Sequence, residues 1–367
     1  MRIVYVLTVL GIGGAERQAV TLAQRMQERG HAVALLVLRS RVAEEWPTAL
    51  PVVHLGMEKS AARVLAGLAE GRRFLRAFRP DLVHSHTFHA NLAARLFRVI
   101  APAPVVLSTV HNIYEGGWKR MLAYRLTDGL SDRTTVVSGA VARRYIDMGA
   151  VPERKCMVVR NGLDTEEFAP SVERRAHMRA EMDALGEFIW LAAGRIVPAK
   201  DYPNLLRAFA EVWASRPEAR LWIAGEGTEA ELATVSSLAN ELGLGDVVCW
   251  LGLRHDLPAL LDAADGFVLG SEWEGMPLAV GEAMCMEKPV VATDVGGVRE
   301  LVGDAGTVVL PRTPGALAMA MLDIMKMPKE DRNSMGRAAR ERIQSSFSMD
   351  AKADEWEALY RTLTKES

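Results

Sequence analysis

Two glutamates, Glu274 and Glu282, stand eight residues apart where a strand pattern gives way to a helical one. Pro277, which lies between them, has no backbone N–H and therefore suits the first position of a helix. The preceding Gly275 and Met276 would present free N–H groups at the helix N-terminus, a favourable place for a diphosphate. The carboxylates could face one cleft, where one accepts two ribose hydroxyls and the other sugar hydroxyls. A capped helix with two surface acids explains the spacing equally well.

Two cations, Arg195 and Lys200, lie in a turn that follows the strand pattern Phe188–Ala193. An arginine fork and a lysine point charge can neutralise a leaving diphosphate. Taken alone, the pair is slightly better explained as two solvated surface cations. A diphosphate site and an ordinary surface loop therefore both remain open from this turn alone.

A glycine-rich turn, residues 11–14 with the sequence G-I-G-G, separates the first strand pattern from the first helical pattern. Glycine lets the backbone approach a ligand closely, and the turn opens a helix N-terminus. The spacing is not G-x-G-x-x-G, and no acidic residue ends the second strand pattern at Leu38. A nicotinamide or flavin site is therefore poorly supported.

Histidines follow two strand patterns of the first half. His84 and His86 come after Leu82 and Val83 and could ligate a metal, but the sequence shows no third ligand near them. A histidine in a strand is more often structural, so we expect no metal site. His111 follows a later strand pattern and is the better functional candidate, because ligands of doubly wound sheets bind beyond the carboxyl ends of strands.

Strand and helix patterns alternate along the chain, which predicts parallel sheets covered by helices. In the first half we expect a helix at Ala15–Arg29 and strands at Arg2–Leu10, Ala32–Leu38, Leu82–His84, Val105–Thr109 and Thr134–Val137. In the second half we expect a helix at Tyr202–Ser215 and strands at Phe188–Ala193, Leu221–Ala224, Val247–Trp250, Gly266–Leu269 and Val290–Thr293. The fold class is thus α/β, with two Rossmann-like, doubly wound domains.

The junction between the two halves is expected near residues 160–170, where Asn161, Gly162 and Pro170 interrupt the pattern. We assign residues 1–165 to the first domain and 166–345 to the second. Residues 346–367 form a last helix that could close the second domain or cross back onto the first.

Charge is divided unevenly between the halves. Residues 1–164 hold 23 Lys/Arg and 13 Asp/Glu, whereas the remainder holds 21 and 33. A basic first half favours an anionic partner, either a phosphorylated acceptor or an acidic membrane surface. Nucleic acid is the weaker alternative, because no recognition motif is present. A membrane-facing surface or ordinary solvated helix faces would equally explain Arg72, Arg73, Arg76, Arg79, Trp118, Lys119 and Arg120.

Several classes of protein are disfavoured by what the sequence lacks. Three widely separated cysteines argue against a disulfide framework and suit a reducing compartment. No apolar run reaches the ~18–20 residues of a spanning helix. We therefore expect a cytoplasmic protein that could lie peripherally on the inner face of the plasma membrane. The sequence contains no D-x-D, H-E-x-x-H, G-x-S-x-G or P-loop motif.

Five motifs in chain order resemble those of the large family-four retaining glycosyltransferases of the GT-B fold. They are G-G-A-E-R at 13–17, T-V-H-N at 109–112, N-G-L-D at 161–164 with Phe168, G-R at 194–195 with Lys200, and E-G-M-P at 274–277 with Glu282. The run K-P-V-V-A-T-D-V-G-G at 288–297 is also typical. The resemblance extends over nearly the whole chain and implies two domains that face a central cleft.

The resemblance also implies roles for single residues. Arg195 and Lys200 would hold the donor diphosphate, Glu282 the ribose and Glu274 the transferred sugar, while His111 would hold a sugar hydroxyl near the reacting carbon. The nucleotide base would stack near residues 250–254. Other expected donor-binding residues are Gly13, Gly14, Gly194, Leu253, Gly275, Met276, Pro277 and Leu278. Arg17 and Asn161 are expected at the acceptor side or the domain junction.

The resemblance implies a retaining, metal-independent hexosyltransferase with no cofactor beyond its nucleotide-sugar donor, for which we favour a UDP-sugar. The acceptor would be a glycan or a lipid-linked glycan of cell-surface polysaccharide, lipopolysaccharide or glycolipid. One departure from the family is Asp201, where a glycine or a neutral residue is common after the lysine. The alternatives are a nucleotide-sugar epimerase of the same fold and a non-catalytic sugar-nucleotide binding protein.

Overall fold

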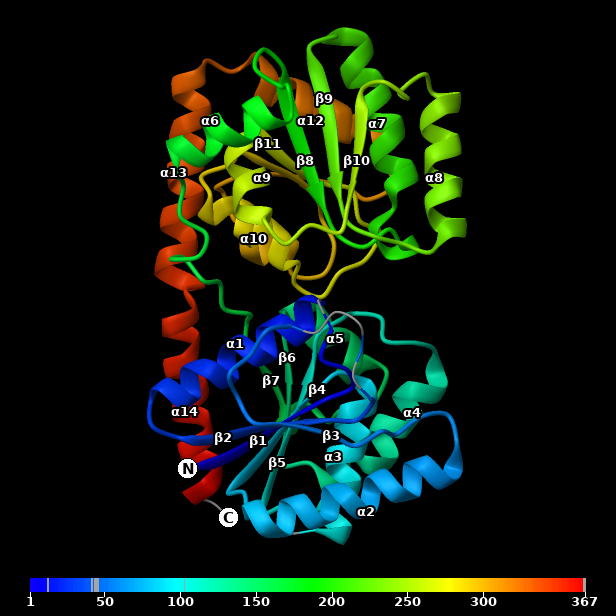
Figure 1. The fold of residues 1–367 in the computed structure, drawn as a ribbon, viewed down its shortest axis with the longest axis vertical. Helices are drawn as coiled ribbons and strands as arrows, with labels where there is room; N and C mark the ends of the chain where they lie inside the picture. Colours follow the sequence, from blue (N-terminus) through cyan, green and yellow to red (C-terminus); the bar gives the residue numbers. More distant parts are fainter. Residues whose placement is uncertain (12, 41, 43–45, 102, 366–367) are drawn as a thin grey trace. The chain divides into compact units, whose positions relative to one another are not determined.

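The computed structural model describes residues 1–11, 13–40, 42, 46–101 and 103–365. Ile12, which belongs to the expected glycine turn, lies outside the described residues. The chain forms two compact units. Unit 1 comprises Met1–Gly162 and Met349–Ser367, and unit 2 comprises Leu163–Ser348. Each unit is a parallel sheet with helices on both faces (Figure 1), which confirms the predicted α/β, doubly wound class.

The sheet of unit 1 has seven strands among the described residues, in the order β3-β2-β1-β4-β5-β6-β7. They are β1 (Arg2–Leu7), β2 (Ala32–Val37), β3 (Val52–His54), β4 (Leu82–His86), β5 (Val105–Val110), β6 (Arg133–Val136) and β7 (Cys156–Val158). The helices are α1 (Gly14–Glu28), α2 (Ala61–Phe78), α3 (Phe88–Ile100), α4 (Trp118–Thr127), α5 (Gly139–Asp147) and α14 (Met349–Lys365). The strand order reverses between β1 and β4. The loops that follow these two strands therefore meet at the carboxyl edge of the sheet.

Alternate side chains of β1 build two cores in unit 1, because successive residues of a strand point to opposite faces. Ile3, Tyr5 and Leu7 pack with α1 and α14. Val4 and Val6 pack with α2 and α3 on the other face. The last helix of the chain is thus part of the core built on the first strand, and Arg29 of the α1 end pairs with the α14 carboxylates.

The sheet of unit 2 has six strands among the described residues, in the order β10-β9-β8-β11-β12-β13. They are β8 (Phe188–Ala193), β9 (Ala219–Ala224), β10 (Val248–Gly252), β11 (Gly266–Leu269), β12 (Val290–Thr293) and β13 (Thr307–Val309). The helices are α6 (Val172–Glu181), α7 (Tyr202–Ser215), α8 (Glu229–Glu241), α9 (Leu257–Ala263), α10 (Leu278–Cys285), α11 (Val298–Val302), α12 (Pro314–Lys326) and α13 (Lys329–Ser346).

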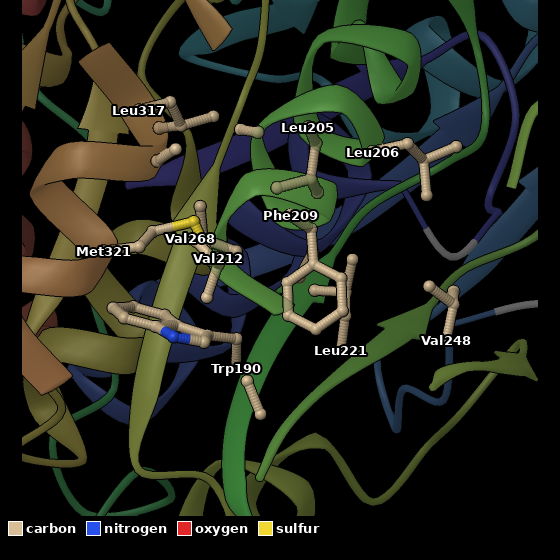
Figure 2. Close-up of a cluster of buried hydrophobic side chains, with 14 of the residues drawn as sticks. Trp190, Leu205, Leu206, Phe209, Val212, Leu221, Val248, Val268, Leu317 and Met321 are labelled. Carbon is tan, nitrogen blue, oxygen red and sulfur yellow. The ribbon is translucent and has the colours of Figure 1, made fainter. Parts of the chain in front are cut away.

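One face of this second sheet is closed by α7, α8 and α12. Trp190 of β8 and Leu221 of β9 pack there against Phe209 of α7 and Met321 of α12. Figure 2 shows these side chains gathered in one apolar layer. The layer fixes β8, whose carboxyl end leads into the turn that carries Arg195 and Lys200. No helix in the described part of the chain is long and apolar enough to cross a membrane.

Candidate functional site

Three loops converge at the carboxyl edge of the unit 2 sheet, because β8, β11 and β12 are neighbouring parallel strands. They are residues 194–201 after β8, 270–277 after β11 and 294–297 after β12. Backbone hydrogen bonds tie the first two loops together: the N–H groups of Glu272 and Trp273 donate to the Ala199 carbonyl oxygen at 2.9 and 3.4 Å. The tie brings Lys200 beside the expected two-glutamate segment.

The Glu274 side chain is almost fully buried and is held through one of its two oxygens. Lys200 Nζ donates to Glu274 Oε1 at 2.6 Å, and Ser271 Oγ donates to the same oxygen at 2.7 Å. The second oxygen, Oε2, has no hydrogen-bond partner among the described residues. A carboxylate oxygen can accept two hydrogen bonds, so Oε2 is chemically suited to a ligand hydroxyl.

Gly194 lies at the end of β8, where the side chain of Lys200 crosses the backbone and leaves no room for a larger residue. Gly194 has φ +155°, and a Cβ atom there would lie 2.9 Å from Lys200 Cε. The Tyr202 hydroxyl donates to the Gly194 carbonyl oxygen at 2.7 Å and fixes this turn. The glycine thus leaves room for the lysine stem to lie against the backbone.

The end of β12 and the loop after it pack against the backbone of the Glu274 loop, a role that the sequence analysis did not assign. A Cβ atom at Gly296, whose φ is +57°, would lie 2.2 Å from the Glu274 carbonyl oxygen. The Gly297 N–H donates to the Gly275 carbonyl oxygen at 2.7 Å, and Thr293 Oγ1 donates to that of Ser271 at 2.6 Å. The run K-P-V-V-A-T-D-V-G-G was the available signal for these supporting residues.

Helix α10 begins at Leu278, one residue later than expected. Pro277 has ψ 114°, which is extended backbone, so it precedes the helix instead of occupying its first turn. Its missing N–H still costs nothing at a helix start. Glu282 lies inside α10 and is buried, as are Gly275 and Met276.

Arg195 differs from Lys200 in its surroundings. It is exposed and has no ion pair among the described residues, so its guanidinium group can reach an incoming anion. Asp201, the departure from the family pattern, has φ 43° and ψ 51° and caps α7 by accepting from Asn204 N at 3.3 Å. Aspartate tolerates this left-handed conformation, which explains how it replaces glycine without disturbing the turn.

The loop after β10 contains the expected base-binding residues. Leu253 is half-buried. Arg254 forms a fork to Asp256, with N–O distances of 2.8 and 2.5 Å. This hydrogen-bonded pairing lowers the pKa of Asp256, despite the opposing effect of burial. The fork holds Arg254 in place next to Leu253.

The expected glycine loop of unit 1 leads directly into α1. Gly13 is the N-cap residue and Gly14 the first helical residue. Arg17 follows in the first turn, with its guanidinium carbon 5.0 Å from the centre of the Trp46 ring. Asn161 is buried near the end of the first segment of unit 1.

The histidines of β4 lie within the strand instead of following it. His84 uses both ring nitrogens: Nδ1 lies 2.7 Å from the Tyr360 hydroxyl and Nε2 lies 2.6 Å from Thr109 Oγ1. Neither nitrogen is therefore open to a metal ion. No group of three or more His, Cys, Asp or Glu in the described residues could hold a metal ion.

His86 lies next to His111, with 2.9 Å between His86 Nδ1 and His111 Nε2. Burial lowers the pKa of His111 to about 4 and that of His86 well below its usual range. The pair is neutral at physiological pH, so one imidazole donates a hydrogen bond to the other. His86 is a functional neighbour that the sequence analysis treated as structural.

The expected site residues thus fall into two groups, each placed by its own sheet edge. Unit 1 carries Gly13, Gly14, Arg17, His111 and Asn161. Unit 2 carries Gly194, Arg195, Lys200, Leu253, Glu274, Gly275, Met276, Pro277, Leu278 and Glu282. The second group offers two cations, two carboxylates and a helix start, which together suit a phosphorylated, hydroxyl-rich ligand.

Two family profiles match the chain one after the other. The profile described as Glycosyltransferase Family 4 matches residues 12–167, and that described as Glycosyl transferases group 1 matches residues 173–342. The chain is 30% identical to D-inositol 3-phosphate glycosyltransferase of Segniliparus rotundus over 302 residues, which cover 78% of this chain and 67% of that protein.

Two further similarities span most of the chain. An Escherichia coli relative, UDP-Gal:alpha-D-GlcNAc-diphosphoundecaprenol alpha-1,3-galactosyltransferase, is 25% identical over 308 residues, covering 78% of this chain and 77% of that protein. The crystal structure of Anabaena HepE in complex with UDP and glucose superposes with a TM-score of 0.86 at 19% identity, covering 98% of this chain and 99% of that one.

Proposed function

Because the chain belongs to the group 1 glycosyltransferases of the GT-B fold, we propose that it moves a sugar from a UDP-sugar to a glycan or lipid-linked acceptor, with retention and without a metal ion. The observation that carries the proposal is the arrangement of Lys200, Glu274 and Arg195 at the carboxyl edge of the unit 2 sheet. It supplies positive charge for a diphosphate and a carboxylate oxygen for a sugar hydroxyl.

The cations would act on charge that grows during the reaction. As the bond between the anomeric carbon and the diphosphate oxygen breaks, negative charge collects on the leaving diphosphate. Lys200 is held beside the site by Glu274, and Arg195 is free to swing onto the phosphates. A preorganised donor of this kind contributes about 10²–10³ in rate, which removes the need for a divalent metal.

Retention follows from a front-face attack in this proposal. The acceptor hydroxyl attacks the anomeric carbon on the face that the diphosphate leaves, and its proton passes to a phosphate oxygen. A double displacement would instead need a carboxylate nucleophile close behind the anomeric carbon. Glu274 is poorly suited to that role, because Lys200 and Ser271 hold its Oε1 atom.

His111 would hold a sugar hydroxyl instead of acting as the base. Its imidazole, with a pKa of about 4, is neutral at physiological pH and a weak proton acceptor. Its hydrogen bond with His86 sets the tautomer and the orientation of the ring. A hydrogen bond to a donor hydroxyl would then place the sugar ring.

The nature of the substrates rests on the relatives. The Escherichia coli relative is named for UDP-Gal and for a diphosphoundecaprenol-linked acceptor. An acceptor with a diphosphate suits the basic first half of this chain, where 23 Lys/Arg oppose 13 Asp/Glu. We therefore place the enzyme in the synthesis of a cell-surface glycan or glycolipid, on the cytoplasmic side of the membrane.

A thermal-shift panel with UDP-, GDP- and ADP-sugars, each with and without EDTA, tests the donor. We expect a UDP-sugar to raise the melting temperature most, with no effect of EDTA. Stabilisation by no nucleotide sugar contradicts the proposal, and a loss with EDTA contradicts metal independence. The anomeric coupling constant of the product in proton NMR tests retention, and an epimerised donor in place of a glycosylated product would favour the epimerase alternative.

An anionic membrane surface is the second partner that we propose, and helices α2, α3 and α4 form the face that would meet it. Helix α3 packs against both α2 and α4 (Figure 1). Large apolar side chains are exposed on all three helices: Val64, Leu65, Leu96, Val99, Trp118, Leu122 and Leu126. Trp118, Leu122 and Leu126 recur at a spacing of four along α4, so they share one face.

The charge of these helices complements anionic lipid. Together α2, α3 and α4 contain nine Lys/Arg and a single acid, Glu70. Helices α1 and α14, on the opposite face of the same sheet, contain six acids against five Lys/Arg. Lys119 and Arg125 are exposed beside the apolar residues of α4, whereas Arg120 turns inward over the Phe88 ring. An interfacial helix combines these features.

Vesicle flotation tests the membrane surface. The protein should float with phosphatidylglycerol vesicles, float little with phosphatidylcholine vesicles, and lose binding as salt rises. Leu126→Ser should weaken binding by roughly tenfold, since it removes one leucine that would become buried in the lipid. Leu185→Ser is the matched control, because both leucines are 75% exposed but Leu185 lies in unit 2. Equal effects of the two substitutions, or no flotation of the wild type, would contradict this surface.

A further inference from the structure

The loop that carries His111 contains a carboxyl group that the proposed reaction does not use. Residues 111–117, with the sequence H-N-I-Y-E-G-G, connect β5 to α4. Glu115 lies four residues after His111, and its side chain turns inward instead of facing solvent, as its contacts show. A buried acid on a short loop needs a partner, and here the partners come from neighbouring helices.

A chain of hydrogen bonds connects the Glu115 carboxyl group to the end of β5. The Tyr124 hydroxyl on α4 donates to Glu115 Oε2 at 2.8 Å. Asn91 Nδ2 on α3 donates to the Tyr124 oxygen at 2.9 Å and to the Thr109 carbonyl oxygen at 3.0 Å. Thr109 lies two residues before His111, so the two ends of the loop segment are tied through fully buried side chains.

The loop backbone is held as well. The Arg120 guanidinium group donates to the Glu115 carbonyl oxygen and lies over the Phe88 ring, with 4.7 Å between its central carbon and the ring centre. The Tyr114 N–H donates to Asn112 Oδ1 at 3.1 Å, which closes a side-chain turn next to His111. The backbone N–H of His111 also faces the Glu115 carboxyl group and favours its ionised form.

From these contacts we infer that Glu115 is a positioning residue that fixes the loop carrying His111, by anchoring it to Tyr124 and thus to α3 and α4. The inference rests on the proposed role of His111 at the donor sugar. Glu115 itself would not touch a substrate. Without its anchor the loop would still have the Arg120 contact, the turn at Asn112 and the Tyr114 ring against Arg144, but the His111 ring would sample more orientations.

The ionisation of the group supports this role. Burial raises the pKa of Glu115 to about 7, although the hydroxyls of Tyr124 and Tyr145, Arg120 and the His111 N–H oppose the shift. Arg144 and Tyr145 approach the cluster from α5, and the Tyr145 hydroxyl also faces the Glu115 carboxyl group, although without ordinary hydrogen-bond geometry. Because burial raises this pKa, a detached and solvated carboxyl group would release its proton at lower pH, so the anchor weakens as pH rises through about 7.

Steady-state kinetics of Glu115→Gln, Glu115→Ala and Tyr124→Phe test the inference, with Glu241→Gln as the control for the loss of one carboxylate. Glutamine keeps an acceptor for Tyr124 but cannot titrate. We expect Glu115→Ala and Tyr124→Phe to lower kcat by roughly tenfold, the worth of one hydrogen bond to a charged group, with the donor KM little changed. Glu241→Gln, which neutralises an exposed acid on α8, should keep the wild-type kcat. The wild-type kcat should fall several-fold from pH 6 to pH 8, and this fall should be absent in Glu115→Gln.

Hydrogen exchange of residues 111–117 gives a second readout that does not depend on turnover. Protection should fall in Glu115→Ala and persist in Glu241→Gln. Unchanged kcat and exchange in Glu115→Ala, equal losses in Glu115→Ala and Glu241→Gln, or a wild-type pH profile in Glu115→Gln would overturn the inference. A wild type that binds no nucleotide sugar would instead contradict the proposed function, and the exchange measurement would still decide whether Glu115 anchors the loop.

Discussion

The ammonium group of Lys200 lies 2.6 Å from Glu274 Oε1, and both groups are largely buried. The two residues come from loops after different strands, 74 positions apart in the chain. Each therefore fixes the other before any ligand arrives. Lys200 thus offers a positive charge that is fixed in position, and Glu274 Oε2 can still accept a hydrogen bond from a ligand.

Replacing Lys200 by alanine should damage the chemical step more than donor binding. The variant loses the charge that would stabilise the leaving diphosphate, so we expect kcat to fall by about 10²–10³. Donor affinity, measured by calorimetry, should change by less than tenfold, because Arg195 and the start of α10 remain. Lys326→Ala, which removes an exposed lysine paired with Asp323, is the control and should behave as wild type. A full kcat in Lys200→Ala would rule out its assigned role.

Replacing Glu282 by alanine should instead abolish most donor binding. Its carboxylate is buried inside α10, where it would accept the ribose hydroxyls. Hydrogen bonds to a charged group are worth about 1.5–3 kcal/mol, so the donor Kd should rise by roughly 10- to 100-fold. Glu241→Ala, an exposed acid on α8, should leave the Kd unchanged. The same Kd in Glu282→Ala and wild type would place the ribose elsewhere.

Strand and helix periods were enough to predict the α/β, doubly wound class, whereas the GT-B fold was implied by the resemblance of the motifs. The strands Phe188–Ala193, Gly266–Leu269 and Val290–Thr293 have the expected bounds, because they are short apolar runs closed by glycine or polar residues. The first strand was predicted too long: β1 ends at Leu7. The β-branched Thr8 and the apolar Leu10 both suit a strand, but their carbonyl oxygens accept from the N–H groups of Arg39 and Trp46 in the following loops.

Loop residues that define the candidate site were predicted from motifs, whereas their partners were not. Nothing local to Ser271 or Gly296 shows that they contact Glu274, because the contacts depend on which strands are neighbours. The same holds for His86, whose partner His111 lies 25 residues away. The contact between Tyr360 and His84 could not be predicted either, because it depends on how the last helix packs against the first sheet.

His111 should make the protein less stable in acid. Its pKa is about 4 in the folded protein, against an ordinary value of 6.5. The unfolded chain therefore binds a proton that the folded chain does not bind between about pH 6.5 and 4, and folding free energy is lost as pH falls through this window. Relative to wild type, His111→Gln should gain melting temperature between pH 7 and pH 4.5, whereas Asn112→Ala should show a constant difference. A constant difference in His111→Gln would show that the imidazole is protonated in the folded state.

Glu115 should have the opposite effect on stability. Its pKa is raised from 4.5 to about 7 in the folded protein, so the folded chain holds a proton that the unfolded chain has already released. Its contribution to stability is fully present below about pH 4.5 and is lost as pH rises through about 7. Glu115→Gln should therefore gain stability relative to wild type between pH 5 and pH 8, measured by urea unfolding at each pH. Glu241→Gln, an exposed acid on α8, serves as the control for the loss of one negative charge. A stability difference between Glu115→Gln and wild type that stays flat from pH 5 to pH 8 would mean that the carboxyl group is solvated and does not anchor the His111 loop.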